Sequence, residues 1–94
     1  METQAKDDAS RYRANLRGEI DGASLYRTLA ATERDPRLAD VYRRLAAVEE
    51  AHAEFWRAQL RRLGAAIPEF RPDFRTRALG WLARRFGPGF ILPP

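Results

Sequence analysis

Pro36 is the only proline in the first 67 residues of this 94-residue chain, and its position constrains the fold. Proline is excluded from helix interiors and restricts the residue before it, but it suits the first turn of a new helix, where Asp35 can act as the cap. The sequence therefore predicts one helix over about residues 8–33 and a second over about residues 36–63, ended by Gly64. Two long helices with a short turn between them form an antiparallel hairpin.

The remaining residues have a different character. Two prolines in residues 65–72 predict a linker, and a shorter helix is predicted over about residues 73–86, where a glycine–proline–glycine run ends it. We interpret the chain as all-α, with a helical hairpin in residues 1–64 and a linker plus a short cationic amphipathic helix in residues 65–94. Candidate caps for the first helix are Asp7, Asp8 and Ser10.

The composition narrows the class of protein. A domain this small buries a low fraction of its surface, so association with another chain would add stability. The absence of cysteine excludes disulfides, zinc–thiolate sites and iron–sulfur clusters. The polar first residues carry no signal-peptide pattern, and no apolar run is long enough to span a membrane. We therefore expect a soluble cytoplasmic protein, or one at the inner face of a membrane when part of a longer chain.

The net charge of +4 is unevenly distributed. Residues 1–64 carry 12 basic and 11 acidic side chains, and residues 65–94 carry 5 and 2, which leaves +1 on the hairpin and +3 on the tail. A balanced helical surface is typical of a solvated face, so no nucleic-acid partner is expected. The arginines and aromatic residues of the tail favour a helix packed on the hairpin or on a second subunit over a helix lying on an anionic membrane.

One acid lies in the middle of the apolar stripe of the first helix. At about 100° per residue, five apolar or aromatic side chains fall within about 60° of Glu19. They are Tyr12, Leu16, Ala23, Tyr26 and Ala30. Burying an unpaired carboxylate is unfavourable, so Glu19 requires a cation, a proton or a polar partner.

The second helix places two more titratable groups on its apolar face. Glu49 and His52 share that face, whereas Glu50 and Glu54 fall outside it beside arginines. The rest of the predicted inward stripe is Leu38, Tyr42, Leu45, Trp56, Leu60 and Leu63, widened by Val41, Val48 and Phe55. Because the hairpin brings the two stripes together, Glu19, Glu49 and His52 are predicted to meet in one interface.

Two carboxylates and one imidazole form a metal-ligand set. Carboxylates can bridge two cations, and a set rich in oxygen and without thiolate favours iron or manganese over structural zinc. Two chains would together supply the four carboxylates and two imidazoles of a di-iron centre in a helix bundle. A metal-free reading stays open, because Glu-x-x-His often arises by chance and Glu19 can form a hydrogen-bonded pair with His52.

At these residues the chain resembles the rubrerythrin branch of the ferritin-like superfamily. The resemblance rests on LRGEIDGASLYRTLA around Glu19, on VYRRLAAVEEAHAEFW around Glu49 and His52, and on the 30-residue separation of the two glutamates. Within that branch the chain is most similar to the N-terminal domain of bacterial membrane proteins that carry a vacuolar-iron-transporter-type domain. It is also similar to encapsulated ferritins.

The resemblance implies that Glu19, Glu49 and His52 are iron ligands, that Glu49 bridges two ions, and that iron(II) is oxidised by oxygen or peroxide. The second helix pair of a rubrerythrin-like domain is missing here. The chain is therefore either a fragment of a longer protein or a half-bundle that completes itself by dimerising. The half-bundle implies a homodimer or higher homo-oligomer whose four long helices form a ferritin-like four-helix bundle, with two iron ions at the dimer interface. Manganese is an alternative metal, and a membrane transporter domain or an encapsulin shell is an implied partner.

We accordingly predict a non-haem di-iron protein with ferroxidase-type activity, in which Glu19, Glu49 and His52 are both metal ligands and catalytic residues. An alternative is an iron- or manganese-binding regulatory or delivery domain of a membrane metal transporter, without turnover. A third possibility is a metal-free helical interaction module.

Overall fold

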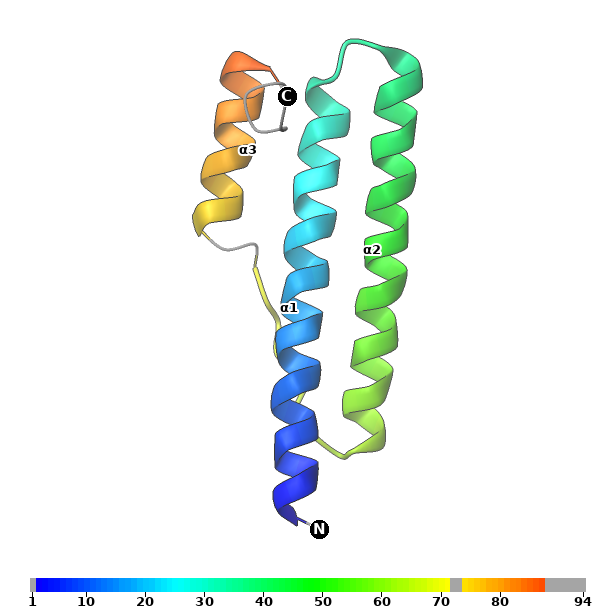
Figure 1. Cartoon of the computed structure of the whole chain (residues 1–94), viewed down its shortest axis with the longest axis vertical. Coiled ribbons are helices and arrows are strands. Elements are labelled where there is room, and N and C mark those ends of the chain that lie inside the picture. The colour runs from blue at the N-terminus through cyan, green and yellow to red at the C-terminus, as the bar shows by residue number, and fades with distance from the viewer. Residues whose placement is uncertain (1, 72–73, 88–94) are drawn as a thin grey trace.

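The computed structural model describes residues 2–71 and 74–87, which form three helices: α1 (Glu2–Thr32), α2 (Pro36–Arg62) and α3 (Phe74–Phe86). α1 and α2 run antiparallel along the length of the molecule, and α3 lies against α1 on the side away from α2 (Figure 1). The described residues contain no strand. The predicted all-α fold is confirmed.

The turn at Pro36 and the end of α2 follow the predicted rules. Asp35 is extended, and its side chain accepts a hydrogen bond from the amide of Arg37 at 2.9 Å. Gly64 has a φ of 66°, a left-handed conformation that glycine adopts without strain. The amide of Ala65 donates to the carbonyl of Leu60 at 3.0 Å, which closes the end of the helix.

The start of α1 differs from the prediction. The helix begins at Glu2 rather than near Asp8, so none of the three candidate residues caps its N-terminus. Asp8 instead lies inside the helix and accepts hydrogen bonds from Gln4 at 3.0 Å and Arg11 at 2.8 Å. The residues before Asp8 are exposed. Local helix propensity and these bonds between neighbouring turns therefore account for the extra length, without burial.

Two clusters of buried side chains hold α1 against α2. One contains Ala9, Leu16, Ala53 and Leu60, and the other contains Leu29, Ala30 and Tyr42. Tyr26 extends the second cluster by stacking on Tyr42, with ring centroids 6.4 Å apart. Glu19 and Glu49 lie between the two clusters along the hairpin, so both ends of the site are held by packed apolar side chains.

The linker and α3 cover a different side of α1. Arg13 donates to the carbonyl of Ala66 at 3.3 Å, and the guanidinium of Arg17 lies 5.1 Å from the centre of the Phe70 ring. α3 approaches α1 closely at Gly80, where a Cβ would lie 3.2 Å from the hydroxyl of Thr28.

One face of α3 therefore packs on the hairpin, as the favoured interpretation of the cationic tail required. Its Trp81 and Phe86 side chains are exposed. The predicted start of this helix at residue 73 lies outside the described residues, and the division at residue 64 stays a prediction. Within the described part of the chain, no helix has the length and hydropathy needed to cross a membrane.

The predicted inward stripe of α2 is only partly correct. Tyr42 and Leu60 are buried and Trp56 is half-buried, as expected. The other members are exposed: Leu38, Val41, Leu45, Val48, His52, Phe55 and Leu63. The reason is geometric. A face 120° wide is broader than the contact that one neighbouring helix makes, so α1 covers only the side of α2 that carries Ala46 and Ala53.

Candidate metal centre

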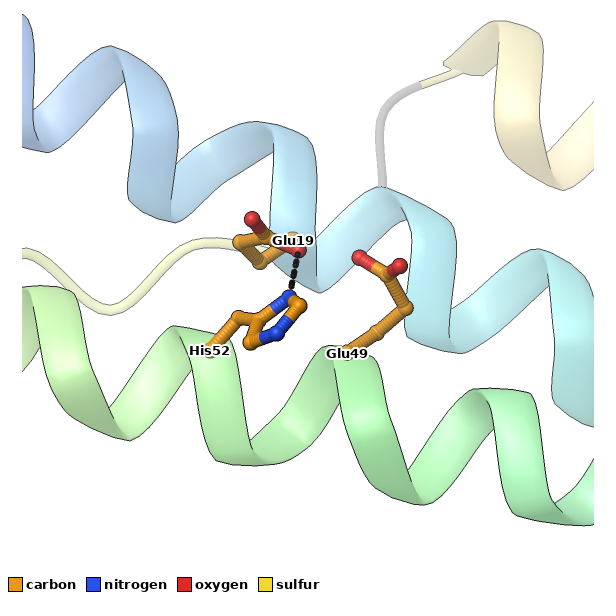
Figure 2. Close-up of side chains that lie close together, drawn as sticks. All are labelled: Glu19, Glu49 and His52. Atoms are coloured by element: carbon orange, nitrogen blue, oxygen red, sulfur yellow. Dashed lines mark ion pairs between the residues drawn. The ribbon is translucent and has the colours of Figure 1, made fainter.

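Three titratable side chains from two helices meet near the middle of the hairpin. Glu19 comes from α1, and Glu49 and His52 come from successive turns of α2. Figure 2 shows the three pointing toward one another across the space between the helices. Nδ1 of His52 lies 3.5 Å from Oε2 of Glu19. One ligand atom from each residue can be chosen so that all lie within 4.8 Å of one another. The structure thus brings together all the site residues that the sequence predicted.

Local packing explains this convergence. Residues three apart on a helix lie on the same face, which places Glu49 and His52 side by side. Three residues close to the site along the two helices are buried alanines: Ala23 on α1, and Ala46 and Ala53 on α2. Small side chains let two helices approach closely. The carboxylate and imidazole groups can therefore reach one another across the space between α1 and α2.

Gly22 makes room for Glu49, a role that the sequence pattern did not predict. A Cβ at position 22 would lie 3.1 Å from Oε2 and 3.4 Å from Cδ of Glu49. The carboxylate of Glu49 therefore occupies space that any other residue at position 22 would restrict. The available signal was a glycine in the interior of a long helix, where it is less stable than alanine by about 0.5–1 kcal/mol.

The site is covered on one side and open on the other. The side chain of Glu19 is 22% exposed, whereas that of His52 is 55% exposed. An ion held by these residues would be screened by α1 and α2 on one side only. A further element on the exposed side of His52 is needed to enclose it.

The two carboxylates influence each other. The pKa of Glu49 is raised above its ordinary value, first because protonated Glu49 can share a hydrogen bond with Glu19. Burial and the negative charge of Glu19 raise this pKa further, and His52 lowers it in part. Two carboxylates at this distance resist carrying full charge together, so the site favours either a proton or a cation between them.

The other glutamates of this part of α2 do not join the cluster. Glu50 forms an ion pair with Arg27 of α1. Glu54 accepts a hydrogen bond from Arg61 at 2.6 Å, and this bond holds the pKa of Glu54 below its ordinary value. Both side chains are 59% exposed, as the angular analysis predicted. Glu50 and Glu54 can therefore serve as controls for Glu49, because they are close to it in sequence but lie outside the candidate site.

The donor set fits a transition-metal ion. Bonds from a metal to oxygen or imidazole nitrogen are about 2.1 Å long, so two atoms 3.5 Å apart can bind the same ion. A carboxylate oxygen up to 4.8 Å away can bind a second ion about 3.5–4 Å from the first, or the same ion after a side-chain shift of less than about 1 Å. Oxygen and imidazole ligands suit iron and manganese. Three residues leave the coordination of even one such ion incomplete.

Comparison with known proteins gives one match. Residues 13–79 match the family model described as Rubrerythrin, a segment that spans more than two thirds of the chain and includes Glu19, Glu49 and His52. No curated protein and no solved structure matches the chain significantly.

Proposed function

The chain belongs to the rubrerythrin family, and from this premise we propose that it is a non-haem iron protein that oxidises iron(II) to iron(III). Glu19, Glu49 and His52 bind the metal. A second copy of the chain contributes the same three residues, and two iron(II) ions are held between the copies as substrates. Manganese can occupy the same set of oxygen and nitrogen ligands.

The observation that carries this proposal is the convergence of Glu19, Glu49 and His52 within 4.8 Å, inside the segment that matches the family. Two carboxylates in a partly enclosed position repel each other, and a divalent cation between them converts that repulsion into attraction. When no cation is present, the pKa of Glu49 is raised by a hydrogen bond shared with Glu19, then by burial and by the negative charge of Glu19.

The ligand count supports a shared site. Carboxylate-bridged di-iron centres in helix bundles take four carboxylates and two imidazoles. One copy of this chain offers two carboxylates and one imidazole at the cluster. His52 is exposed on the open side, where a second copy can approach. A two-fold related pair would supply the full set without any further residue.

The proposed reaction balances with two ions and one oxidant. Two iron(II) ions lose one electron each, and dioxygen takes up both electrons and two protons to form hydrogen peroxide. With hydrogen peroxide as the oxidant, two electrons and two protons give two molecules of water. Glu19 and Glu49 assist because their negative charge stabilises iron(III) more than iron(II).

The experiment is iron(II) oxidation by the full chain with a matched pair of variants. Glu49→Gln keeps the size of the side chain and removes its charge. We expect it to lower the rate of iron(II) oxidation at least tenfold, measured by oxygen consumption and by iron(III) absorbance. Glu50→Gln, one residue along and paired with Arg27, is expected to retain the wild-type rate. Undiminished iron binding and oxidation by Glu49→Gln would contradict the proposal.

The same measurement separates oxidation from delivery. A domain that only binds and passes on iron would take up a fixed ratio of iron(II) per chain and consume no oxygen. A metal-free interaction module would retain no iron or manganese after growth in supplemented medium and desalting. Oxygen consumption with repeated additions of iron(II) is the outcome expected for the proposed activity.

The narrower relationships of the sequence analysis are also part of the proposal. This chain has one Glu and one Glu-x-x-His motif in a single helix hairpin. Encapsulated ferritins share that arrangement and complete their bundle by dimerising. If the chain is attached to a membrane transporter domain, the iron(III) product would be transported. If it is enclosed in an encapsulin shell, the iron(III) would be stored. Neither partner is needed for the reaction itself.

A further inference from the structure

α2 carries two apolar seams, and α1 covers only one of them. The covered seam contains residues spaced alternately by three and four: Ala39, Tyr42, Ala46, Glu49, Ala53 and Trp56. The second seam has the same spacing and is exposed: Leu38, Val41, Leu45, Val48, His52 and Phe55. Alternating steps of three and four along a helix are the pattern of a packed helix–helix contact.

The exposed seam is long and continuous. Its five apolar side chains retain between 37 and 53% of their surface. From Leu38 to Phe55 the seam extends about 26 Å along the helix. A contiguous apolar stripe of this length on a small protein indicates an interaction surface. His52, a member of the candidate metal centre, is its only polar member.

The angle between the seams indicates what covers the second one. Each residue of the exposed seam directly precedes a residue of the covered seam, which sets the two about 100° apart around α2. A helix at the corner of a four-helix bundle contacts its two neighbours in directions about 90° apart. α2 therefore has the surface of a corner helix with one neighbour in place.

We propose that the exposed seam of α2 packs antiparallel against the same seam of a second copy, with the two-fold axis level with residue 50. This inference rests on the proposed function, because the metal centre on this seam is incomplete without a second copy. Closed pairs of identical chains are related by a two-fold axis. A two-fold axis perpendicular to α2 makes the two helices antiparallel. The numbers of two facing residues then add to a constant, which is twice the residue number at the axis and equals 100 for an axis at residue 50.

The apolar residues alone permit more than one register. If the constant is 93, Leu45 faces Val48 and Leu38 faces Phe55 of the second copy, and only His52 interrupts the apolar layers. If the constant is 100, Leu45 faces Phe55 and Val48 faces His52 of the second copy. Burial of apolar surface favours the first arrangement.

The metal ligands favour the second register. With a constant of 93, the two His52 residues lie about 16 Å apart along the helices, too far for one binuclear site. With a constant of 100, that offset falls to about 6 Å, and the two Glu49 residues are offset by about 3 Å. Ions about 3.5–4 Å apart can then be reached from both copies. The site therefore selects the register centred on residue 50.

Cysteine cross-linking tests the register directly, because the chain has no cysteine of its own. Chains carrying Leu45→Cys and size-tagged chains carrying Phe55→Cys are mixed and oxidised with diamide. The mixture should give a disulfide-linked heterodimer. Either variant alone should give several-fold less, since its own cysteine in the second copy lies about 15 Å away and disulfides require Cα atoms within about 7 Å. Both positions are exposed, so the hairpin should be retained, as circular dichroism can verify.

The matched control is a mixture of Leu45→Cys with Val48→Cys, which reports the register centred near residue 46. Preferential linking of that pair would overturn the proposal. Efficient linking of each variant with itself would also overturn it, because only parallel helices place every residue opposite its own copy. A mixture of Val41→Cys and Gln59→Cys tests the next layer of the proposed register if Phe55→Cys disturbs the fold. No linking of either pair would also overturn it.

The outcome is separable from that of the proposed function. Cross-linking needs no iron, so a linked Leu45→Cys and Phe55→Cys pair in a protein that fails to oxidise iron(II) would refute the activity and retain the interface. Iron(II) oxidation without this link would retain the activity and refute the interface.

Discussion

Nδ1 of His52 lies 3.5 Å from Oε2 of Glu19, although the two residues belong to different helices of the hairpin. His52 is more than half exposed, so solvent screens the attraction between the two side chains. A contact of this kind contributes little to folding. Its position beside Glu49 gives it a different significance, because the same three groups form a ligand set for a metal ion.

Replacing His52 should therefore separate stability from metal binding. We expect His52→Ala to change the free energy of unfolding by less than about 1 kcal/mol, since exposed ion pairs contribute about 0–1 kcal/mol. The same variant should bind iron(II) at least tenfold more weakly, because it removes the only imidazole that the chain can provide. Urea denaturation and calorimetric titration with iron(II) under nitrogen measure the two effects.

The matched control for this variant is Glu50→Gln, which lies two residues away on α2 and outside the candidate metal centre. It should alter neither quantity by more than a small amount. A large loss of stability in His52→Ala with unchanged iron affinity would instead indicate that His52 has a structural role.

The stability of the metal-free protein should depend on pH through Glu49. Its pKa is raised in the folded state, so the folded protein binds this proton more tightly than the unfolded chain does. That contribution to stability is fully present below the ordinary value of 4.5 and is lost as the pH rises through the raised pKa. We expect the free energy of unfolding of chelator-treated protein to contain a component that falls as the pH rises through the raised pKa of Glu49, and Glu49→Gln to remove it.

The comparison variant for pH is again Glu50→Gln, which keeps the Glu19–Glu49 pair. Chemical denaturation at a series of pH values should show the same falling component in this variant as in the wild type. If Glu49→Gln and Glu50→Gln have the same pH profile, the coupling between Glu19 and Glu49 is absent in solution.

Dilution should switch off the proposed reaction. A site built from two copies exists only in the dimer, so the rate of iron(II) oxidation per chain should fall once the protein concentration drops below the dimer dissociation constant. Sedimentation velocity and stopped-flow oxidation at matched concentrations test this, and the two curves should coincide. A rate per chain that stays constant through dissociation would show that one copy is sufficient.

The parts of the fold that could be predicted are those set by single residues with strong local effects. Pro36 and Gly64 fix the limits of α2, because one cannot lie in a helix interior and the other adopts a left-handed conformation without strain. The first residues of α1 carry no such marker. Their helix depends on weak propensities and on bonds such as that between Gln4 and Asp8, so its start was placed too late.

The candidate site was predictable because helical periodicity alone distinguishes Glu49 from Glu50. Helical periodicity could not show that the apolar stripe of α2 consists of two seams. It gives the direction of each side chain around the helix axis, but not which neighbouring helix lies in that direction. His52 was expected to face the core and is exposed in a single copy. The space opposite Gly22 was also invisible, because it depends on the distance between α1 and α2.

Gly22 and Gly18 allow a final test of how the space around Glu49 is built. Both are interior to α1, where replacing glycine by alanine favours the helix by about 0.5–1 kcal/mol. A Cβ at Gly18 meets nothing within 4 Å, whereas one at Gly22 lies 3.1 Å from Oε2 of Glu49. We expect Gly18→Ala to raise the melting temperature and leave iron binding unchanged.

Gly22→Ala should gain less stability than Gly18→Ala and lose iron affinity several-fold. The reason is that the flexible carboxylate of Glu49 can move aside by a few tenths of an ångström, which preserves the fold but displaces a ligand atom. Thermal denaturation of chelator-treated protein and iron(II) titration of both variants provide the comparison. Equal affinities for the two variants would mean that the position of Glu49 against α1 is irrelevant to metal binding. An affinity lost only in Gly22→Ala would show that a residue without a side chain shapes the metal centre.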